Sequence, residues 1–321
     1  MHKHKSILKI IILTLTLLSL FGCNNSNKPT PDKDKIQIIT TLFPQYDFTK
    51  EIVGDKGEVS LLLPPGVEAH SYEPTPRDIV SIRNADVFIY TSKAMEPWAI
   101  KMVSEISSED LKVIDLSEGI QLIDIDGLHD HGDEDHDHED DFDGKDPHIW
   151  LDPVYAQTMV ENITKGLIEV DKNNETFYTN NSEAYIEKLK ALDASFTETF
   201  SKTKSDTILY GGHFAFGYFT ERYGLKHISP YIGFSPNAEP TPNRIVELIK
   251  TLETAEFKVI YYEELVDPKV AKTISDQTGA KMLMLHGAHN ISKEEIEAGV
   301  SYLEIMYENQ EKLKEGLGYG K

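Results

Sequence analysis

The strongest constraint on the fold of this chain is an internal repeat. The tetrapeptide Glu73-Pro74-Thr75-Pro76 recurs as Glu239-Pro240-Thr241-Pro242, and each copy leads through a helix-like segment into a short apolar run. In each copy we expect the threonine to cap a helix whose first turn holds the second proline, where no amide hydrogen is needed. The apolar runs Val87–Tyr90 and Val259–Tyr262 are then predicted to be buried strands.

The similarity continues on both sides of these helices. The stretch IQIITTLFPQYDFTKEI parallels SDTILYGGHFAFGYFTERY, and LKVIDLSEGI parallels AKMLMLHGAH, in the same order and offset by about 170 residues. Chance could explain one tetrapeptide, but not four parallel stretches in one order. Because each half alternates strands with helices, we predict an α/β fold of two similar βα lobes with mainly parallel sheets.

A single long helix is predicted to join the two lobes. Residues 175–202 place large apolar side chains at steps of three and four, the spacing of one helical face: Tyr185, Leu189, Leu192, Phe196 and Phe200. Such a helix would be roughly 40 Å long. One stiff connection predicts lobes that rock only slightly about a ligand cleft between them.

The amino end lies outside this repeated fold. A basic leader and an apolar run too short to span a bilayer occupy residues 1–22 and predict a signal peptide, so we expect an exported protein. Cys23, the only cysteine, follows a glycine as in bacterial lipoprotein cleavage sites, and its lipidation would anchor the protein to the outer face of the cell membrane. An ordinary secretion signal with an incidental thiol is the alternative.

This protein has 321 residues, more than one hydrophobic core usually holds, so we predict two domains. Residues 23–35, which carry Cys23 and a polar, proline-bearing run, are predicted to be a flexible tether. An N-terminal lobe over residues 36–174, the linking helix over 175–202 and a C-terminal lobe over 203–321 then follow.

Charge and cysteine content narrow the class of ligand. Lysine and arginine number 32 against 54 aspartates and glutamates, a formal net charge of −22, which argues against nucleic acid and favours a cation. Without a cysteine in the mature chain, a metal site has to use His, Asp or Glu side chains.

Four histidines stand beside predicted strands or helices. His70 precedes the first EPTP, His148 lies in DPHIWLDP at the end of the first lobe, His213 follows a strand at the place in the second lobe equivalent to that of His70, and His289 ends the run MLMLHGAH. A single loop histidine usually has a surface or capping role. Ligands of α/β folds bind at the carboxyl edge of the sheet, so four histidines placed there favour a shared metal cleft between the lobes.

An acidic, histidine-rich insertion over residues 127–147 stands next to His148. It has no apolar periodicity, so it cannot offset its ordering entropy and is predicted to be disordered without metal. Its histidines are predicted to form a weak accessory loop that gathers zinc beside the main site: His129, His131, His136 and His138. A solvated acidic insertion without such a role is the alternative.

From about residue 36 to residue 317 the chain resembles the zinc-binding lipoproteins that supply ABC importers, through HSYEPTP, the acidic insertion, DPHIWLDP, GGHFAFGYF and LHGAHNISKEE. The resemblance implies two lobes with a rigid helical linker and a Zn²⁺ site whose first three ligands match His70, His148 and His213. The family's fourth position varies and is often a carboxylate. Here His289 matches it, with the alternatives His286, Glu263, Glu264 or a water.

The donor set favours zinc over manganese, because imidazole suits Zn²⁺ while manganese sites contain more carboxylate oxygen. Four neutral imidazole rings leave the double charge of the ion uncompensated. We therefore expect acidic side chains nearby, which would accept hydrogen bonds from the ring N–H groups and so orient the rings. We predict Glu73, Asp152 and Glu263 for that role. His227 is predicted to cap or pack, and His286 to support His289 rather than bind metal.

The resemblance implies a receptor without enzymatic activity, a monomer that delivers Zn²⁺ to a membrane permease driven by a cytoplasmic ATPase. A manganese receptor or adhesin of the same class is the first alternative. An exported zinc hydrolase is the second, but the chain has no H-E-x-x-H, and HDHGDE only approaches the H-x-H-x-D-H pattern.

Overall fold

The computed structural model describes residues 35–106, 111–124, 144–231 and 239–320. The predicted signal peptide, Cys23 and the predicted accessory histidines His129, His131, His136 and His138 lie outside these residues. Within the described ranges, no helix has the length and apolar character needed to cross a bilayer.

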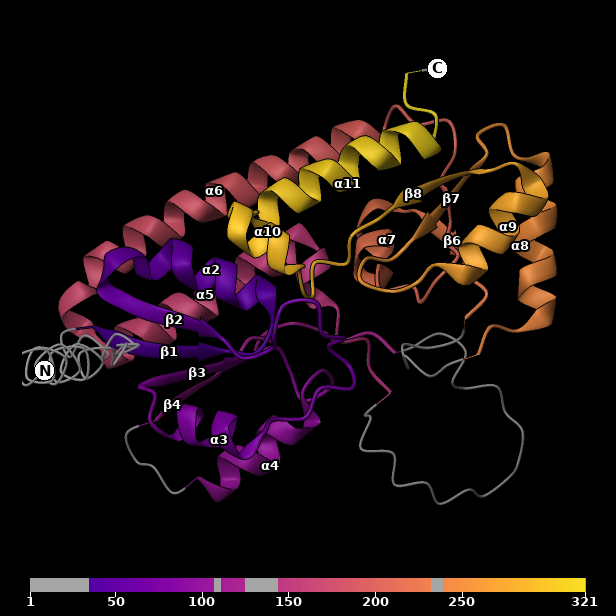
Figure 1. Cartoon of the computed structure of the whole chain (residues 1–321). Coiled ribbons are helices and arrows are strands. Elements are labelled where there is room, and N and C mark those ends of the chain that lie inside the picture. The colour runs from indigo at the N-terminus through magenta and orange to yellow at the C-terminus, as the bar shows by residue number, and fades with distance from the viewer. Residues whose placement is uncertain (1–34, 107–110, 125–143, 232–238, 321) are drawn as a thin grey trace, which may run out of the picture. The chain divides into compact units, whose positions relative to one another are not determined.

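Four parallel strands form the sheet of the first half, in the order β2-β1-β3-β4 (Figure 1). From β1 the chain passes through a helix to β2 on one side of β1, and then through a second helix to β3 on the other side. In chain order, this half contains β1 (Ile36–Thr40), α2 (Phe43–Val53), η1 (Gly54–Lys56), β2 (Gly57–Leu61), α3 (Pro76–Arg83), β3 (Val87–Tyr90), α4 (Pro97–Glu105), β4 (Lys112–Asp115), η2 (Ile149–Leu151), α5 (Pro153–Val170) and η3 (Lys172–Asn174).

The second half repeats this strand order. Its parallel pairs β5-β6 and β7-β8 are joined by a parallel bridge between Tyr210 and Tyr261, which gives β6-β5-β7-β8. The predicted α/β fold with two similar βα lobes is therefore confirmed. The elements are β5 (Thr207–Leu209), α7 (Gly217–Tyr223), β6 (Lys226–Ile228), α8 (Pro242–Thr254), β7 (Val259–Tyr262), α9 (Lys269–Thr278), β8 (Lys281–Met284), α10 (Lys293–Ala298) and α11 (Tyr302–Gly316).

The two EPTP segments start helices α3 and α8, as predicted, and the predicted strands are β3 and β7. Thr75 caps α3, because its side chain accepts a hydrogen bond from the Asp78 backbone N–H. Thr241 holds the N-cap position of α8 without a side-chain cap bond. Its third helical residue is Arg244, which cannot complete the reciprocal bond that Asp78 makes in the first copy.

The long helix α6 (Glu175–Phe200) joins the halves and lies beside α11 (Figure 1). Its predicted apolar face is buried at Tyr185, Leu189, Leu192 and Phe196, and Phe200 packs at the edge of the core. The largest hydrophobic core is continuous through both halves. The predicted lobe boundaries therefore stay a prediction, since no gap in the core separates them.

Hydrogen bonds also connect the halves directly. The indole Nε1 of Trp150 in η2 donates to the Gly287 carbonyl at 2.8 Å, and the Asn290 side chain donates to the Pro64 carbonyl at 2.8 Å. Both donors are buried. Such bonds resist separation of the halves and add a second physical reason, beside the linking helix, for expecting only slight relative motion.

A buried polar cluster lies at the carboxyl ends of β1 and β3. The Glu96 carboxylate accepts hydrogen bonds from the Thr91 hydroxyl at 3.0 Å, from the Thr91 and Ser92 backbone N–H groups at 3.1 and 3.2 Å, and from the Thr41 hydroxyl. Burial raises the pKa of Glu96 to about 7, although these hydrogen bonds oppose the shift.

This raised pKa predicts a pH-dependent stability. A carboxyl whose folded pKa exceeds its unfolded value stabilises the fold below the unfolded pKa, and the contribution is lost as pH rises through the folded pKa. Between pH 4.5 and 7, the free energy of unfolding of the wild type should fall relative to that of Glu96→Gln, by up to about 1.4 kcal/mol per pH unit. Chemical denaturation in EDTA measures the difference, and a difference that stays constant with pH would contradict the assignment.

Candidate metal site

Histidines 70 and 148 meet at the carboxyl edge of the first sheet. His70 lies in the loop between β2 and α3, where the Glu68 carboxylate accepts a hydrogen bond from its backbone N–H at 2.8 Å. His148 directly precedes η2 and is only 1% exposed. The two Nε2 atoms lie 3.2 Å apart, close to the ~3.3 Å that separates two nitrogens on a tetrahedral zinc ion.

Asp146 orients the ring of His148. One of its carboxylate oxygens accepts from the His148 backbone N–H at 2.9 Å and lies 2.8 Å from the ring Nδ1. An Nδ1–H that donates to a carboxylate places the lone pair on Nε2, the tautomer that binds a metal through that atom. Burial raises the pKa of Asp146 to about 8, opposed by its hydrogen bond from the His148 backbone, and a cation bound at the site would favour the ionised form that accepts from Nδ1–H.

The second half brings two more rings to the same place. The centroid of the His70 ring is 6.1 Å from that of His213 and 6.1 Å from that of His289, and His148 and His289 are 6.5 Å apart. In the described part of the chain, no three or more His, Cys, Asp or Glu side chains already stand in an arrangement that could hold a metal ion. Metal binding would therefore require the rings to move from these positions.

The ring of His213 faces a carboxylate as well. Its Nδ1 lies 3.4 Å from one Glu263 oxygen, and its backbone N–H donates to the other at 3.4 Å. Burial raises the pKa of Glu263 to about 7, so this carboxyl titrates near neutral pH. Of the three predicted acidic partners, Glu263 is the one that contacts a predicted ligand.

His289 is held by a strained loop after β8. Ala288 has a φ of 55°, the left-handed region that residues with a Cβ rarely occupy, and its N–H donates to the His286 Nδ1 at 2.9 Å. A Cβ on Gly287 would lie 2.8 Å from the His289 ring, so this position requires glycine. Strain of this kind persists where the surroundings enforce it, often at functional sites.

Glu264 lies behind His289. One oxygen accepts from the Gly287 N–H at 2.7 Å, and the other is 3.2 Å from the His289 Nδ1 without hydrogen-bond geometry, which leaves both buried atoms unsatisfied. Burial by itself raises the pKa of Glu264, but His286, His289 and the Gly287 N–H lower it overall. A hydrogen bond from the His289 ring N–H to this ionised carboxylate would orient the ring for metal binding.

The histidine pKa values favour metal binding at neutral pH. Burial, followed by the neighbouring histidines, lowers the pKa of His70 and of His148 well below the usual range. Burial and His289 lower that of His213 to about 4. At pH 7 these three rings are therefore neutral, the state that binds a metal without first releasing a proton.

Two of the predicted acidic partners are placed differently from the prediction. Glu73 is exposed. Asp152 caps α5 through the Val154 N–H and receives two-pronged hydrogen bonds from Arg222 at 2.7 to 3.0 Å. Asp146, which faces the His148 ring, was not among the predicted partners, although its position two residues before His148 is a detectable signal.

The other two described histidines have supporting roles. His227 stacks on Phe214 with ring centroids 3.7 Å apart, which confirms the predicted packing role. His286 is buried, and its Nε2 lies 3.8 Å from a Glu295 oxygen in α10, directed toward that helix. One detail of the prediction is wrong: His213 follows β5, the counterpart of β1, whereas His70 follows β2, so the two positions are not equivalent.

Substitution of Glu264 tests whether this carboxylate orients His289 or binds the metal itself. Replacement of such a partner typically lowers metal affinity by about 10- to 100-fold, so we expect that loss for Glu264→Gln. His289→Ala should cost more. Zinc titration against a competing chelator measures both variants, and a larger loss for Glu264→Gln would identify Glu264 as the fourth ligand.

The molecule has two βα halves with parallel sheets, and one long helix joins them. Four histidine rings, two from each half, lie close together. These features define the class of two-lobed metal receptors. The sequence profile of the family described as "Zinc-uptake complex component A periplasmic" (ZnuA) matches residues 38–316. The chain belongs to the ZnuA family of zinc-uptake proteins, and the resemblance found in its sequence motifs is thereby confirmed.

Individual relatives support the same family. The high-affinity zinc uptake system protein ZnuA of Bacillus subtilis is 39% identical over 96% of this chain and 97% of its own length. The zinc-binding lipoprotein AdcA of Streptococcus pneumoniae is 35% identical over 96% of this chain, which spans only 60% of that longer relative. The crystal structure of the Zn(II)-bound ZnuA-like domain of that AdcA matches with a TM-score of 0.73 and 32% identity, over 88% of this chain and 99% of the domain.

Proposed function

We propose that this protein is an extracytoplasmic, lipid-anchored receptor that binds Zn²⁺ through His70, His148, His213 and His289 and delivers it to an ABC importer. The observation that carries the proposal is the pair of His70 and His148 Nε2 atoms 3.2 Å apart, with the His213 and His289 rings beside them. The importer would consist of a membrane permease and a cytoplasmic ATPase.

The chemistry of the site supports zinc as the cargo. A set dominated by imidazole nitrogens suits Zn²⁺, whereas Mn²⁺ prefers more oxygen ligands. The carboxyl groups of Asp146, Glu263 and Glu264 face ring nitrogens. The ionised Glu264 would offset part of the charge of the ion, and a bound cation would favour ionisation of Asp146 and Glu263, whose pKa values burial raises. Because the ligands come from both halves, zinc would bind the closed arrangement more tightly than the open one.

The remaining features follow from this role. Lipidation of Cys23 would keep the receptor beside the permease, and His129, His131, His136 and His138 would form an accessory loop that raises the local zinc concentration. The names of the zinc-binding lipoprotein and zinc-uptake relatives support both the anchor and the cargo. The receptor would act as a monomer and catalyse no reaction.

A competitive titration of residues 24–321 with zinc and manganese tests the proposal. We expect one tight zinc site that survives deletion of residues 129–143, with much weaker manganese binding. At a zinc concentration a thousandfold above the Kd, binding should raise the free energy of unfolding by about 4 kcal/mol. Tighter manganese binding would indicate a manganese receptor, and loss of the tight site on deletion would place the principal site in the insertion.

A further inference from the structure

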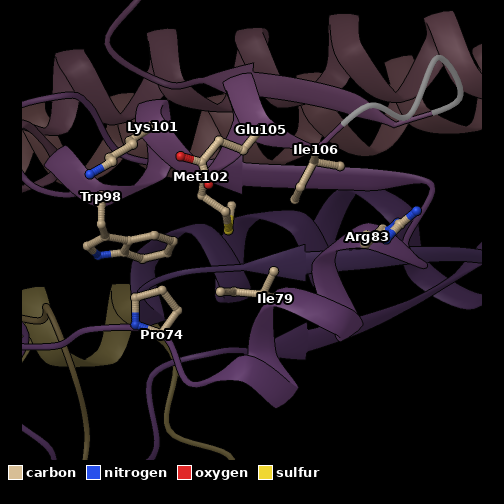
Figure 2. Close-up of a pocket in the computed structure, with 8 residues that line it drawn as sticks. All are labelled: Pro74, Ile79, Arg83, Trp98, Lys101, Met102, Glu105 and Ile106. Atoms are coloured by element: carbon tan, nitrogen blue, oxygen red, sulfur yellow. The ribbon is translucent and has the colours of Figure 1, made fainter.

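The loop that carries His70 runs from β2 to α3, and its two ends are held in different ways. The end that follows His70 packs within the first half, where Pro74 faces Trp98 across a groove between α3 and α4 (Figure 2). The Tyr72 and Trp98 rings also lie edge to face, with centroids 6.3 Å apart. The end that precedes His70 is an exposed turn, residues 64–67, so the placement of His70 depends on what holds this turn.

The shape of this turn follows from its sequence, Pro64-Pro65-Gly66-Val67. The Val67 N–H donates to the Pro64 carbonyl at 3.2 Å, and Gly66 has a φ of 79°. Proline at the second position and a left-handed glycine at the third are typical of a type II turn. All four residues are exposed, so packing does little to fix where the turn lies on the molecule.

Asn290 of the second half holds this turn. Its side chain is fully buried, and its Nδ2 atom donates to the Pro64 carbonyl at 2.8 Å and to the Val67 carbonyl at 2.7 Å. One amide group thus binds the first and the last residue of the turn. The Gly66 N–H donates to the Ile291 carbonyl at 3.0 Å, which adds a third bond between the same two segments.

His289, the residue before Asn290, is also bonded to the first half through its backbone. The Phe43 N–H donates to the His289 carbonyl at 3.3 Å. One short segment of the second half, residues 289–291, therefore carries one of the proposed ligands and holds the turn that leads to another.

The link between the turn and the His70 ring is short. His70 follows Val67 by three residues. Between them, the Glu68 carboxylate accepts hydrogen bonds from the His70 N–H at 2.8 Å and from the Ser71 N–H at 2.9 Å, and Ala69 is buried. A shift of the turn would therefore displace the ring as well.

We propose that Asn290 is a positioning residue that fixes the His70 ring relative to the His289 ring, whose centroids lie 6.1 Å apart. The inference rests on the proposed function and adds a residue that acts through the backbone of the His70 loop. Asparagine suits this role because its amide nitrogen carries two hydrogens, one for each carbonyl. A leucine of similar size could fill the same buried space without holding the turn, so packing alone does not require asparagine here.

A double-mutant cycle on residues 24–321 tests whether Asn290 acts through His70. Zinc affinity is measured by competition with a chelator for Asn290→Ala, for His70→Ala and for the two changes together. Asn309→Ala is the matched control in both backgrounds. Asn309 is also a buried asparagine and makes two side-chain bonds of 2.8 Å to the backbone of His286, but both residues belong to the second half.

We expect Asn290→Ala to weaken zinc binding by about tenfold when His70 is present, and by less than about twofold when His70 is already replaced. Asn309→Ala acts on the loop of His289, so its effect should be similar in both backgrounds. An unchanged zinc affinity in Asn290→Ala, or a loss that is as large without His70 as with it, would overturn the inference.

A pair of glycine variants tests the turn from its exposed side. Gly66→Ala strains the turn, because residues with a Cβ rarely adopt a φ of 79°, although the added Cβ would meet no other group within 4 Å. Gly119 has the same φ and the same open space but lies in the turn after β4, so Gly119→Ala is the matched control. We expect only Gly66→Ala to weaken zinc binding. Equal zinc affinities would overturn the inference even if the Asn290 variants do not fold.

Cobalt provides a readout that a purely structural role would not change. The visible absorption of bound Co²⁺ depends on the number and geometry of its ligands, so Asn290→Ala should shift this spectrum toward that of His70→Ala. A spectrum identical to that of the wild type would overturn the inference. A wild type that does not bind zinc tightly overturns the proposed function, whereas tight binding in the wild type and in all Asn290 and Gly66 variants overturns this inference alone.

Discussion

Replacing His148 with alanine should abolish tight zinc binding, with a loss in affinity of at least about 100-fold. Altering a carboxylate that merely orients a ligand already costs about 10- to 100-fold, and removal of the ligand itself should cost more. His148 is the most buried of the four histidines, and its Nε2 is 3.2 Å from that of His70. Competition with a chromophoric chelator gives the affinity.

The matched control is Val170→Ala. Val170 is exposed at the carboxyl end of α5, the end opposite to the one that follows His148, so its truncation should leave the zinc affinity unchanged. Asp146→Asn should give an intermediate loss, because the amide can keep a contact with the His148 ring but carries no charge. Tight zinc binding in His148→Ala would show that the principal ligands lie elsewhere.

Replacing Trp150 with alanine should lower the free energy of unfolding by about 3 to 5 kcal/mol, the usual cost of truncating a buried large aromatic side chain. The side chain is fully buried in the core shared by both halves. Its indole N–H also donates to the Gly287 carbonyl, beside His289, so the variant loses a link between the halves along with its packing.

Chemical denaturation in EDTA measures this effect without a contribution from zinc. Trp98→Ala is the control, because Trp98 is only partly buried and lines the groove between α3 and α4. Trp150→Phe should cost less than alanine, since it keeps most of the ring and loses the hydrogen bond. A loss for Trp150→Ala no larger than that for Trp98→Ala would show that the shared core does not hold the halves together.

Much of the fold could be predicted because its signals are local. The apolar runs that became β3 and β7 are short, continuous and preceded by helices that begin with proline, and the apolar face of α6 is visible in its residue spacing. Local signals do not show how strands are arranged into sheets. The internal repeat supplied this information, because two copies of one order of strands and helices imply two similar sheets. Three of the four histidines were predicted to meet because they follow strands, and His148 because it closes the first half just before a helix.

The details of the candidate site required the tertiary structure. Glu73 and Asp152 were as plausible as acidic partners as Glu263, because a sequence does not state which way a side chain points. The structure directs Asp152 to Arg222 and leaves Glu73 exposed, while Asp146 and Glu264 face the rings of His148 and His289. The left-handed backbone of Ala288, which positions His289, carries no sequence signal of the kind that glycine would give.

The sequence by itself determined the repeated α/β architecture and the linking helix and proposed the four candidate histidines, because periodicity, helix-start residues and strand ends are properties of neighbouring residues. Only the tertiary structure decided which carboxylate faces which ring and how one core runs through both halves. The shared core depends on groups more than a hundred residues apart, such as the Trp150 side chain and the Gly287 carbonyl, whose contact exists only once both halves have folded. The pairs of carboxylate and ring are closer in sequence, but their contact depends on side-chain directions that the sequence does not state.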